Sequence, residues 1–248
     1  MEAVLQYYQS IDTTLKKIME TQRPNIERAA QLVADCVLAD RIFHVFGTGG
    51  HSNMATIEIC HRAGNLVPCN AILDPGLSCE HGATRWSEKI VGYAQQVLRY
   101  YRVKPGDLLI QFNAYGLNCV SIDTAMECKR LGVTLVAVTS PALSRSISED
   151  FPGRHPTKQN LCDLADVVID SFTPFGEAVV SIEGYQYKVS PISTISNIFI
   201  LNSINAKACE LIAAQGMAPP VWISGNVPGG DKANQDSLDR YFGTLRHL

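Results

Sequence analysis

The feature that most constrains the fold is an alternation of short apolar runs with longer segments whose apolar residues recur at helical spacing. Five runs have the length of a strand: RIFHVFG at 41–47, NLVPCNAI at 65–72, LLIQF at 108–112, VTLVAVTS at 133–140 and LADVVIDS at 164–171. Apolar strands that alternate with helices are typical of a parallel sheet covered on both faces. The sequence therefore predicts an α/β three-layer sandwich around a central five-stranded parallel sheet.

Helices are predicted at both ends of this pattern. Residues 2–22 carry apolar residues at helical spacing, and a second helix over 24–40 is expected because Pro24 suits a first helical turn. A long helix is predicted over 189–216. We expect 1–40 to pack on the core or at a subunit interface, 41–214 to form the sheet domain, and 215–248 to form a tail rich in turn residues.

Composition narrows the possible partners and the compartment. The net charge is −3 and no cluster of Lys or Arg stands out, which argues against nucleic-acid binding. Eight cysteines are scattered without a Cys-x-x-Cys pair, and the first residues lack a signal peptide. No apolar run approaches the roughly 20 residues of a membrane helix. We predict a cytoplasmic protein with reduced thiols and with no nucleic-acid or membrane partner.

Ligands of such sheets bind beyond the carboxyl ends of the strands, where the strand order reverses. This rule selects 47–53, 113–118, 139–146 and 172–177. The first of these segments, Gly47 to Ser52, is rich in glycine and precedes a helix predicted to end near Ala63. It lacks the lysine of a Walker A loop, and the dinucleotide fingerprint breaks at Ser52. Its backbone N–H groups suit an anion, but a close-packed turn explains the same glycines.

Two loops together resemble a known family. FGTGGHSNM, and the stretch from GDLLIQFNAYGLN to VTLVAVTS, are similar to the SIS (sugar isomerase) domain, which has a flavodoxin-like fold. RAGNLVP, EHGA, PISTIS and PPVWISGNVPGGD carry a closer resemblance to a phosphoheptose-isomerase-like group. The resemblance implies aldose–ketose isomerisation, through an enediol, of a sugar with a terminal anionic group. It also implies no nucleotide or redox cofactor and a homodimer or homotetramer.

The second loop departs from the family pattern. SIS domains usually have serines here that hold the sugar phosphate, but this chain has Asn113, Tyr115 and Asn118. These side chains can donate hydrogen bonds, although a phosphate dianion is usually met by many donors or a cation. The substrate anion is therefore either a phosphate that sits differently or a sulfonate. Three cationic residues after the fourth strand could supply charge: Arg145, Arg154 and Lys158.

Isomerisation requires a base and a proton shuttle, and Glu and His suit these roles. We expect Glu58 to be the base and His81 or His61 the acid and shuttle, with Glu80 beside His81 in the same loop. Arg85, Glu88 and Lys89 follow this loop, and Glu177 follows the fifth strand, but no role is assigned to them here.

The resemblance also raises the question of a metal, because some phosphoheptose isomerases bind zinc. Glu58, His61 and His81, with Cys60 or Cys79, supply suitable ligand types, but no tight spacing motif joins them. We therefore expect no metal.

The remaining expected site residues are substrate-binding ones that lie at strand ends, in the loops or at the start of the last helix. They are Gly49, Gly50, His51, Ser52, Asn113, Tyr115, Asn118, Thr139, Ser140, Ser193 and Thr194. Two other functions stay open on the same scaffold. One is a lyase, etherase or amino-sugar deaminase, and the other is a non-catalytic module that senses a sugar phosphate.

Overall fold

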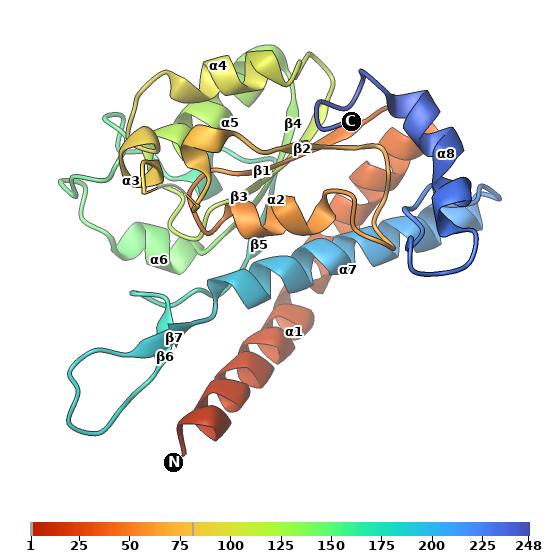
Figure 1. Cartoon of the computed structure of the whole chain (residues 1–248). Coiled ribbons are helices and arrows are strands. Elements are labelled where there is room, and N and C mark those ends of the chain that lie inside the picture. Colours follow the sequence, from red (N-terminus) through yellow and green to blue (C-terminus); the bar gives the residue numbers. More distant parts are fainter. Residues whose placement is uncertain (1, 81) are drawn as a thin grey trace.

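The predicted sheet is present. The computed structural model describes residues 2–80 and 82–248. Its strands β1 (Phe43–Gly47), β2 (Cys69–Ile72), β3 (Leu108–Phe112), β4 (Thr134–Thr139) and β5 (Val167–Asp170) form one parallel sheet in the order β2-β1-β3-β4-β5 (Figure 1). The order reverses between β1 and β3, so the loops that follow these two strands lie side by side at the sheet's carboxyl edge.

Helices cover both faces of the sheet. On one face lie α1 (Ala3–Leu38), α2 (Asn53–Ile59) and α7 (Ser193–Ala214), and on the other lie α4 (Tyr93–Tyr100) and α5 (Cys119–Leu131) (Figure 1). Short helices α3 (Thr84–Ser87) and α6 (Pro141–Ser146), and the 3-10 turns η1 (Pro75–Leu77) and η2 (Leu161–Asp163), lie in the connections. The α/β three-layer sandwich predicted from the sequence is confirmed.

Alternate residues of each strand enter two separate cores. Val45 and Ile110 pack with α1 and α7, whereas Phe46 and Leu109 pack with α4 and α5. All four side chains are fully buried. Because both faces of each strand are covered, the strands consist of nearly continuous apolar residues rather than an alternating pattern.

Two predicted elements differ from the structure. Residues 3–38 form one helix instead of two, and Pro24 lies inside it. The proline removes one backbone hydrogen bond, but the buried face of α1 continues across it from Ile18 to Ile26, and α1 packs along α7. At the other end, α8 (Gly230–Tyr241) lies within the predicted tail. The proposed division at 40 and 214 stays a prediction, since α1 shares a core with the sheet.

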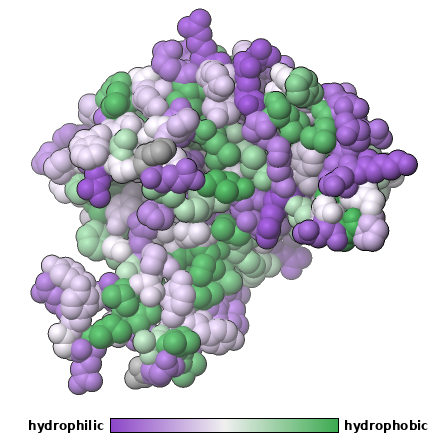
Figure 2. Space-filling model, in the orientation of Figure 1, coloured by the Kyte–Doolittle hydropathy of each residue, from purple (hydrophilic) through white to green (hydrophobic). Residues whose placement is uncertain are grey.

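One part of the molecule projects from the body. Strands β6 (Ala178–Val180) and β7 (Val189–Pro191) pair antiparallel, and we call residues 178–191 the arm. The arm is bonded to the start of α1, where the Tyr7 hydroxyl donates to the Pro191 carbonyl at 2.9 Å. Figure 2 shows apolar side chains on this projecting end. Among the exposed large side chains of the arm and the start of α1 are Val4, Leu5, Tyr8, Ile182, Tyr185 and Tyr187.

Within the described part of the chain, none of the helices has the length and apolar character required to cross a membrane.

The turn from β1 into α2 depends on Gly47. A Cβ atom at this position would lie 2.3 Å from the backbone carbonyl of Ser52, closer than real Cβ contacts come. Because a backbone atom cannot move aside cheaply, the turn requires glycine here.

We expect Gly47→Ala to lower the free energy of unfolding by about 1–3 kcal/mol, the usual cost of forcing an extra carbon into a packed site. Urea unfolding measures this change. Gly82→Ala is the matched control, since a Cβ there meets open space. Equal stability of the two variants would contradict this account of the turn.

Candidate functional site

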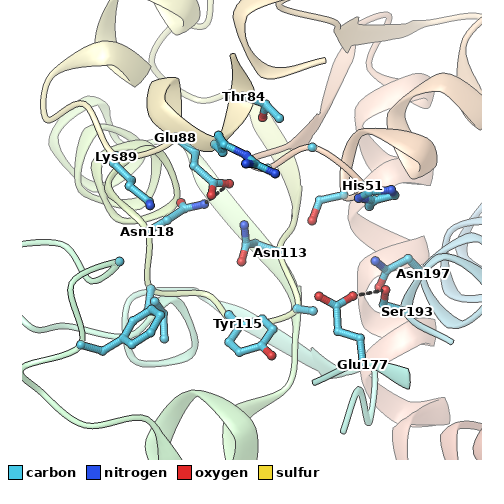
Figure 3. A pocket seen from close by; sticks show the side chains of 18 of the residues that line it. His51, Thr84, Glu88, Lys89, Asn113, Tyr115, Asn118, Glu177, Ser193 and Asn197 are labelled. Carbon is cyan, nitrogen blue, oxygen red and sulfur yellow. Dashed lines mark hydrogen bonds between the residues drawn. The ribbon is translucent and has the colours of Figure 1, made fainter. Parts of the chain in front are cut away.

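A cleft of about 560 Å³ opens at the point where the strand order reverses. The loops after β1 and β3 form its floor, and the segment around α3, the start of α7 and residues 151–153 form its walls (Figure 3). This is where the parallel-sheet rule places a ligand.

The floor is held together at Thr48, which is fully buried. Its carbonyl oxygen accepts hydrogen bonds from the side-chain amides of Asn113 at 2.7 Å and Asn118 at 2.9 Å. Its hydroxyl lies 2.6 Å from that of Ser121 and accepts from Gln111 at 3.1 Å. Thr48 therefore joins the glycine loop to the loop after β3.

The side-chain oxygens of the two asparagines accept hydrogen bonds from backbone N–H groups of the loop after β3 and the start of α5. The Asn113 oxygen accepts from the Gly116 N–H at 2.8 Å, and the Asn118 oxygen caps α5 by accepting from the Ser121 N–H at 2.8 Å. The Asn118 amide also donates to Glu88 at 3.2 Å. Both donors of Asn118 are thus used within the protein, and Asn113 keeps one donor for a ligand.

Glu88 stands on one wall of the cleft, just after α3 (Figure 3). Its backbone carbonyl accepts from the Val120 N–H at 3.2 Å, which ties it to the first turn of α5. Its carboxylate lies beside Gly49, where a Cβ would be 3.2 Å from an Oε atom. Burial raises the pKa of the Glu88 carboxyl above its ordinary value, and the hydrogen bond from Asn118 only partly opposes this.

A second carboxylate, that of Glu177, stands on the opposite wall (Figure 3). Its φ of +63° places it in the left-handed region, at the base of the arm. The Ser193 hydroxyl donates to its Oε2 at 2.6 Å, from the first residue of α7. Tyr115 braces this wall because its hydroxyl accepts from the Gly176 N–H at 3.1 Å.

Donors and positive charge for an anion also line the cleft. Arg85 and Lys89 contribute side chains from the segment around α3. The N–H groups of four loop residues have no acceptor among the described residues: Gly49, Gly50, His51 and Ser52. An anionic group bound here would therefore meet unpaired donors and two cations.

The structure brings many of the predicted binding residues to this cleft. Those that line it are Gly49, Gly50, His51, Ser52, Asn113, Tyr115, Asn118 and Ser193. Thr139 and Ser140 are buried and do not line it. The Thr139 hydroxyl donates to the Ala114 carbonyl at 3.3 Å, and Ser140 lies 3.0 Å from the Ser171 hydroxyl. Thr194 follows Ser193 on α7 without lining the cleft.

The three predicted cations lie elsewhere, paired within their own segment. Arg145 forms an ion pair with Asp163 at 2.7 Å. Arg154 donates to several backbone carbonyls, with Ser144 at 2.8 Å among them. Lys158 approaches Glu149 at 3.4 Å. The positive charge in the cleft comes instead from Arg85 and Lys89, in the segment around α3.

Of the predicted catalytic residues, the three that the structure describes, Glu58, His61 and Glu80, also lie away from the cleft. Glu58 lies on the last turn of α2 and pairs with Arg62 at 3.4 Å. The helix ends at Ile59, four residues before the predicted end, and His61 packs against Trp222 with ring centroids 5.0 Å apart. Glu80 is exposed and does not line the cleft. His81 lies outside the described residues.

Sequence reasoning named Glu88, Arg85, Lys89 and Glu177 without giving them a role. For Arg85, Glu88 and Lys89 the nearby signal was EHGA, at 80–83, through the family resemblance. No periodicity marks this segment, and its position depends on contacts with α5 that are distant in the sequence.

Comparison with solved structures shows the same fold in two enzymes. Phosphoheptose isomerases from Francisella tularensis and Neisseria gonorrhoeae each align with a TM-score of 0.54, at 15% and 12% identity. The alignments cover 84% and 85% of this chain, and 96% and 97% of those enzymes.

Sequence comparison identifies the family. A UPF0309 protein from Caldanaerobacter subterraneus subsp. tengcongensis is 35% identical over 247 residues, which cover 98% of each chain. The model of the SIS domain matches residues 6–140. The expected resemblance is confirmed, and the chain belongs to the UPF0309 family of SIS-domain proteins.

Proposed function

We propose that this protein is an aldose–ketose isomerase for a sugar with a terminal anionic group, acting through an enediol. The observation that carries the proposal is the presence, in one cleft, of a half-buried carboxylate and a group of anion-binding donors and cations. Glu88 supplies the carboxylate, whose pKa is raised by burial. The glycine loop, Arg85 and Lys89 supply the donors and charge.

The proton transfers fit this arrangement. Glu88 removes the proton from C2 of the open-chain aldose while the carbonyl oxygen O1 takes up a proton, which gives the enediol. Return of the proton to C1 and loss of one from O2 give the ketose, with no net change in protons or electrons. Glu177 and His51 face the cleft from the wall opposite Glu88 and are the groups available to O1 and O2 (Figure 3). Glu88 thus replaces Glu58 as the proposed base.

The two cations favour phosphate as the substrate anion over sulfonate. A sulfonate was considered because the loop after β3 has few hydroxyl groups. The structure adds that both amide donors of Asn118 are already used within the protein. However, Arg85 and Lys89 provide charge that was expected from elsewhere, and a dianion gains more from two cations than a monoanion does. Matched 6-phosphate and 6-sulfo sugars decide between them through ligand-induced thermal stabilisation.

The isomerase proposal is tested by NMR in D2O with a panel of phosphosugars and sulfosugars. We expect deuterium to enter C1 or C2 as ketose forms. Exchange at C2 without a ketose would instead indicate a lyase, etherase or deaminase. Tight binding without exchange under turnover conditions would indicate a sensing module and would overturn the proposal.

Substitution of the base should remove most of the activity. We expect Glu88→Gln to lower kcat by about 100-fold or more, the typical contribution of a positioned base. The acidic limb of kcat/KM in the wild type should lie above the ordinary glutamate pKa of about 4.3, because the base acts only when deprotonated and burial disfavours that form.

Glu58→Gln is the comparison variant, since Glu58 pairs with Arg62 outside the cleft. Near-normal turnover is expected for it. A loss of turnover in Glu58→Gln with little effect of Glu88→Gln would reverse the assignment.

The anion-binding region makes a separate prediction. Arg85→Gln should weaken binding of a sugar phosphate by roughly 10- to 100-fold, the value of a charge-assisted hydrogen bond, as measured by isothermal titration calorimetry. Arg145→Gln is the matched control, since this arginine pairs with Asp163 instead. The placement of the anion would be wrong if the two variants bound with equal affinity.

We also propose that the protein is a homodimer or homotetramer, joined through the arm and the start of α1. The exposed apolar side chains on this projecting end support it, because a free two-stranded hairpin is marginally stable. Leu5→Asp combined with Tyr8→Asp should reduce the molar mass measured by light scattering to that of the monomer, 27.1 kDa. Val91→Asp, at another exposed apolar residue, should not. An unchanged mass in the double variant would contradict this interface.

A further inference from the structure

Three metal-ligating side chains meet at the far end of α2. The helix ends at Ile59, and the next two residues, Cys60 and His61, lie beside His247 near the end of the chain. Each offers one ligand atom, and the three atoms all lie within 4.8 Å of one another. Cys60 is a free, half-buried thiol, and the two imidazole rings have their centroids 4.8 Å apart.

The backbone at this point explains how two consecutive residues serve one site. Neighbouring side chains of an extended chain point to opposite sides. His61 instead has a φ of +51°, in the left-handed region that few residues other than glycine adopt. Trp222 packs on the His61 ring. Such a conformation is retained where surrounding contacts enforce it.

His247 is held in place by its neighbours. The Arg246 N–H donates to the Asn70 side chain on β2 at 3.1 Å, and the Arg246 guanidinium donates to the Tyr100 carbonyl at 3.0 Å. Leu245 is fully buried with Val67 and Trp222. The last residues are therefore anchored to the sheet edge, so His247 is positioned before any ligand arrives.

One nitrogen atom of His247 lacks a hydrogen-bond partner among the described residues. This atom, Nδ1, is buried. A buried polar atom without a partner is costly, and native structures have few of them. A metal ion bound at this nitrogen would remove that cost.

We propose that Cys60, His61 and His247 form a zinc site. One thiolate and two imidazoles are ligands that Zn²⁺ prefers, and they leave the fourth position of a tetrahedron free for water. Ligand atoms of a tetrahedral zinc lie closer together than 4.8 Å, and small rotations of the exposed His61 side chain provide the adjustment. The ion would tie the end of α2 to the C-terminal segment.

This site is independent of the proposed isomerase activity. None of the three residues lines the cleft, which begins at the other end of α2. It also differs from the zinc set weighed from the sequence, because it contains neither Glu58 nor His81. Its third ligand, His247, lies almost two hundred residues away along the chain.

Cobalt substitution tests the site directly. The metal-free full-length protein is titrated with Co²⁺, and we expect one equivalent to give a thiolate-to-cobalt charge-transfer band and the strong visible bands of tetrahedral cobalt. Addition of Zn²⁺ should abolish both. His247→Ala and Cys60→Ser should each weaken cobalt binding by more than about tenfold, since even outer-shell changes at metal sites cost 10- to 100-fold.

Cys209→Ser is the matched control, because Cys209 is a second half-buried free thiol outside the cluster. It should keep the bands. Because Cys60→Ser could unfold the chain, circular dichroism is measured for each variant, and zinc should raise Tm in the wild type but not in His247→Ala. Absence of the charge-transfer band in the wild type, or its persistence in a folded His247→Ala, would overturn the proposal.

Discussion

The site rests on one backbone carbonyl, that of Thr48. It accepts hydrogen bonds from Asn113 and Asn118, two residues of the loop after β3. Strand β1, which precedes Thr48, pairs with β3, which precedes this loop, so the sheet brings the two loops together and the asparagines hold them. Removal of these amides would leave a buried carbonyl with fewer partners and would weaken the link between the two loops.

The hydrogen bonds to the Thr48 carbonyl also give a structural role to the loop after β3, which departs from the SIS pattern. The resemblance to SIS domains led us to expect serines that hold a sugar phosphate in this loop, whereas here the side-chain amide of Asn118 donates to Thr48 and Glu88. The asparagines of this loop therefore connect the two halves of the cleft floor. In the proposed mechanism, the glycine loop, Arg85 and Lys89 bind the anion. The hydrogen bond from the Asn118 side chain to Glu88 positions the base.

Patterns of local origin were predictable from the sequence. Apolar runs located all five strands. The rule for parallel sheets selected the loops after β1 and β3, which form the floor of the cleft, but also 139–146, which does not line it. Long-range contacts were not predictable. Pro24 looks like a helix start, and only packing against α7 shows that α1 continues. Glu88 reaches the cleft because Val120, far along the chain, fixes its backbone.

The central claim is that one cleft holds the anion and the reacting carbons of the substrate, with Glu88 as the base. A crystal structure with a hydroxamate analogue of an aldose phosphate tests it most directly, because the planar hydroxamate mimics the enediolate and transition-state analogues bind tightly. The account predicts a hydroxamate oxygen or its carbon neighbour within about 3 Å of the Glu88 carboxylate, with the phosphate against Arg85 and the loop from Gly49 to Ser52. A hydroxamate out of contact with Glu88, or a phosphate bound away from Arg85 and the loop from Gly49 to Ser52, would contradict it.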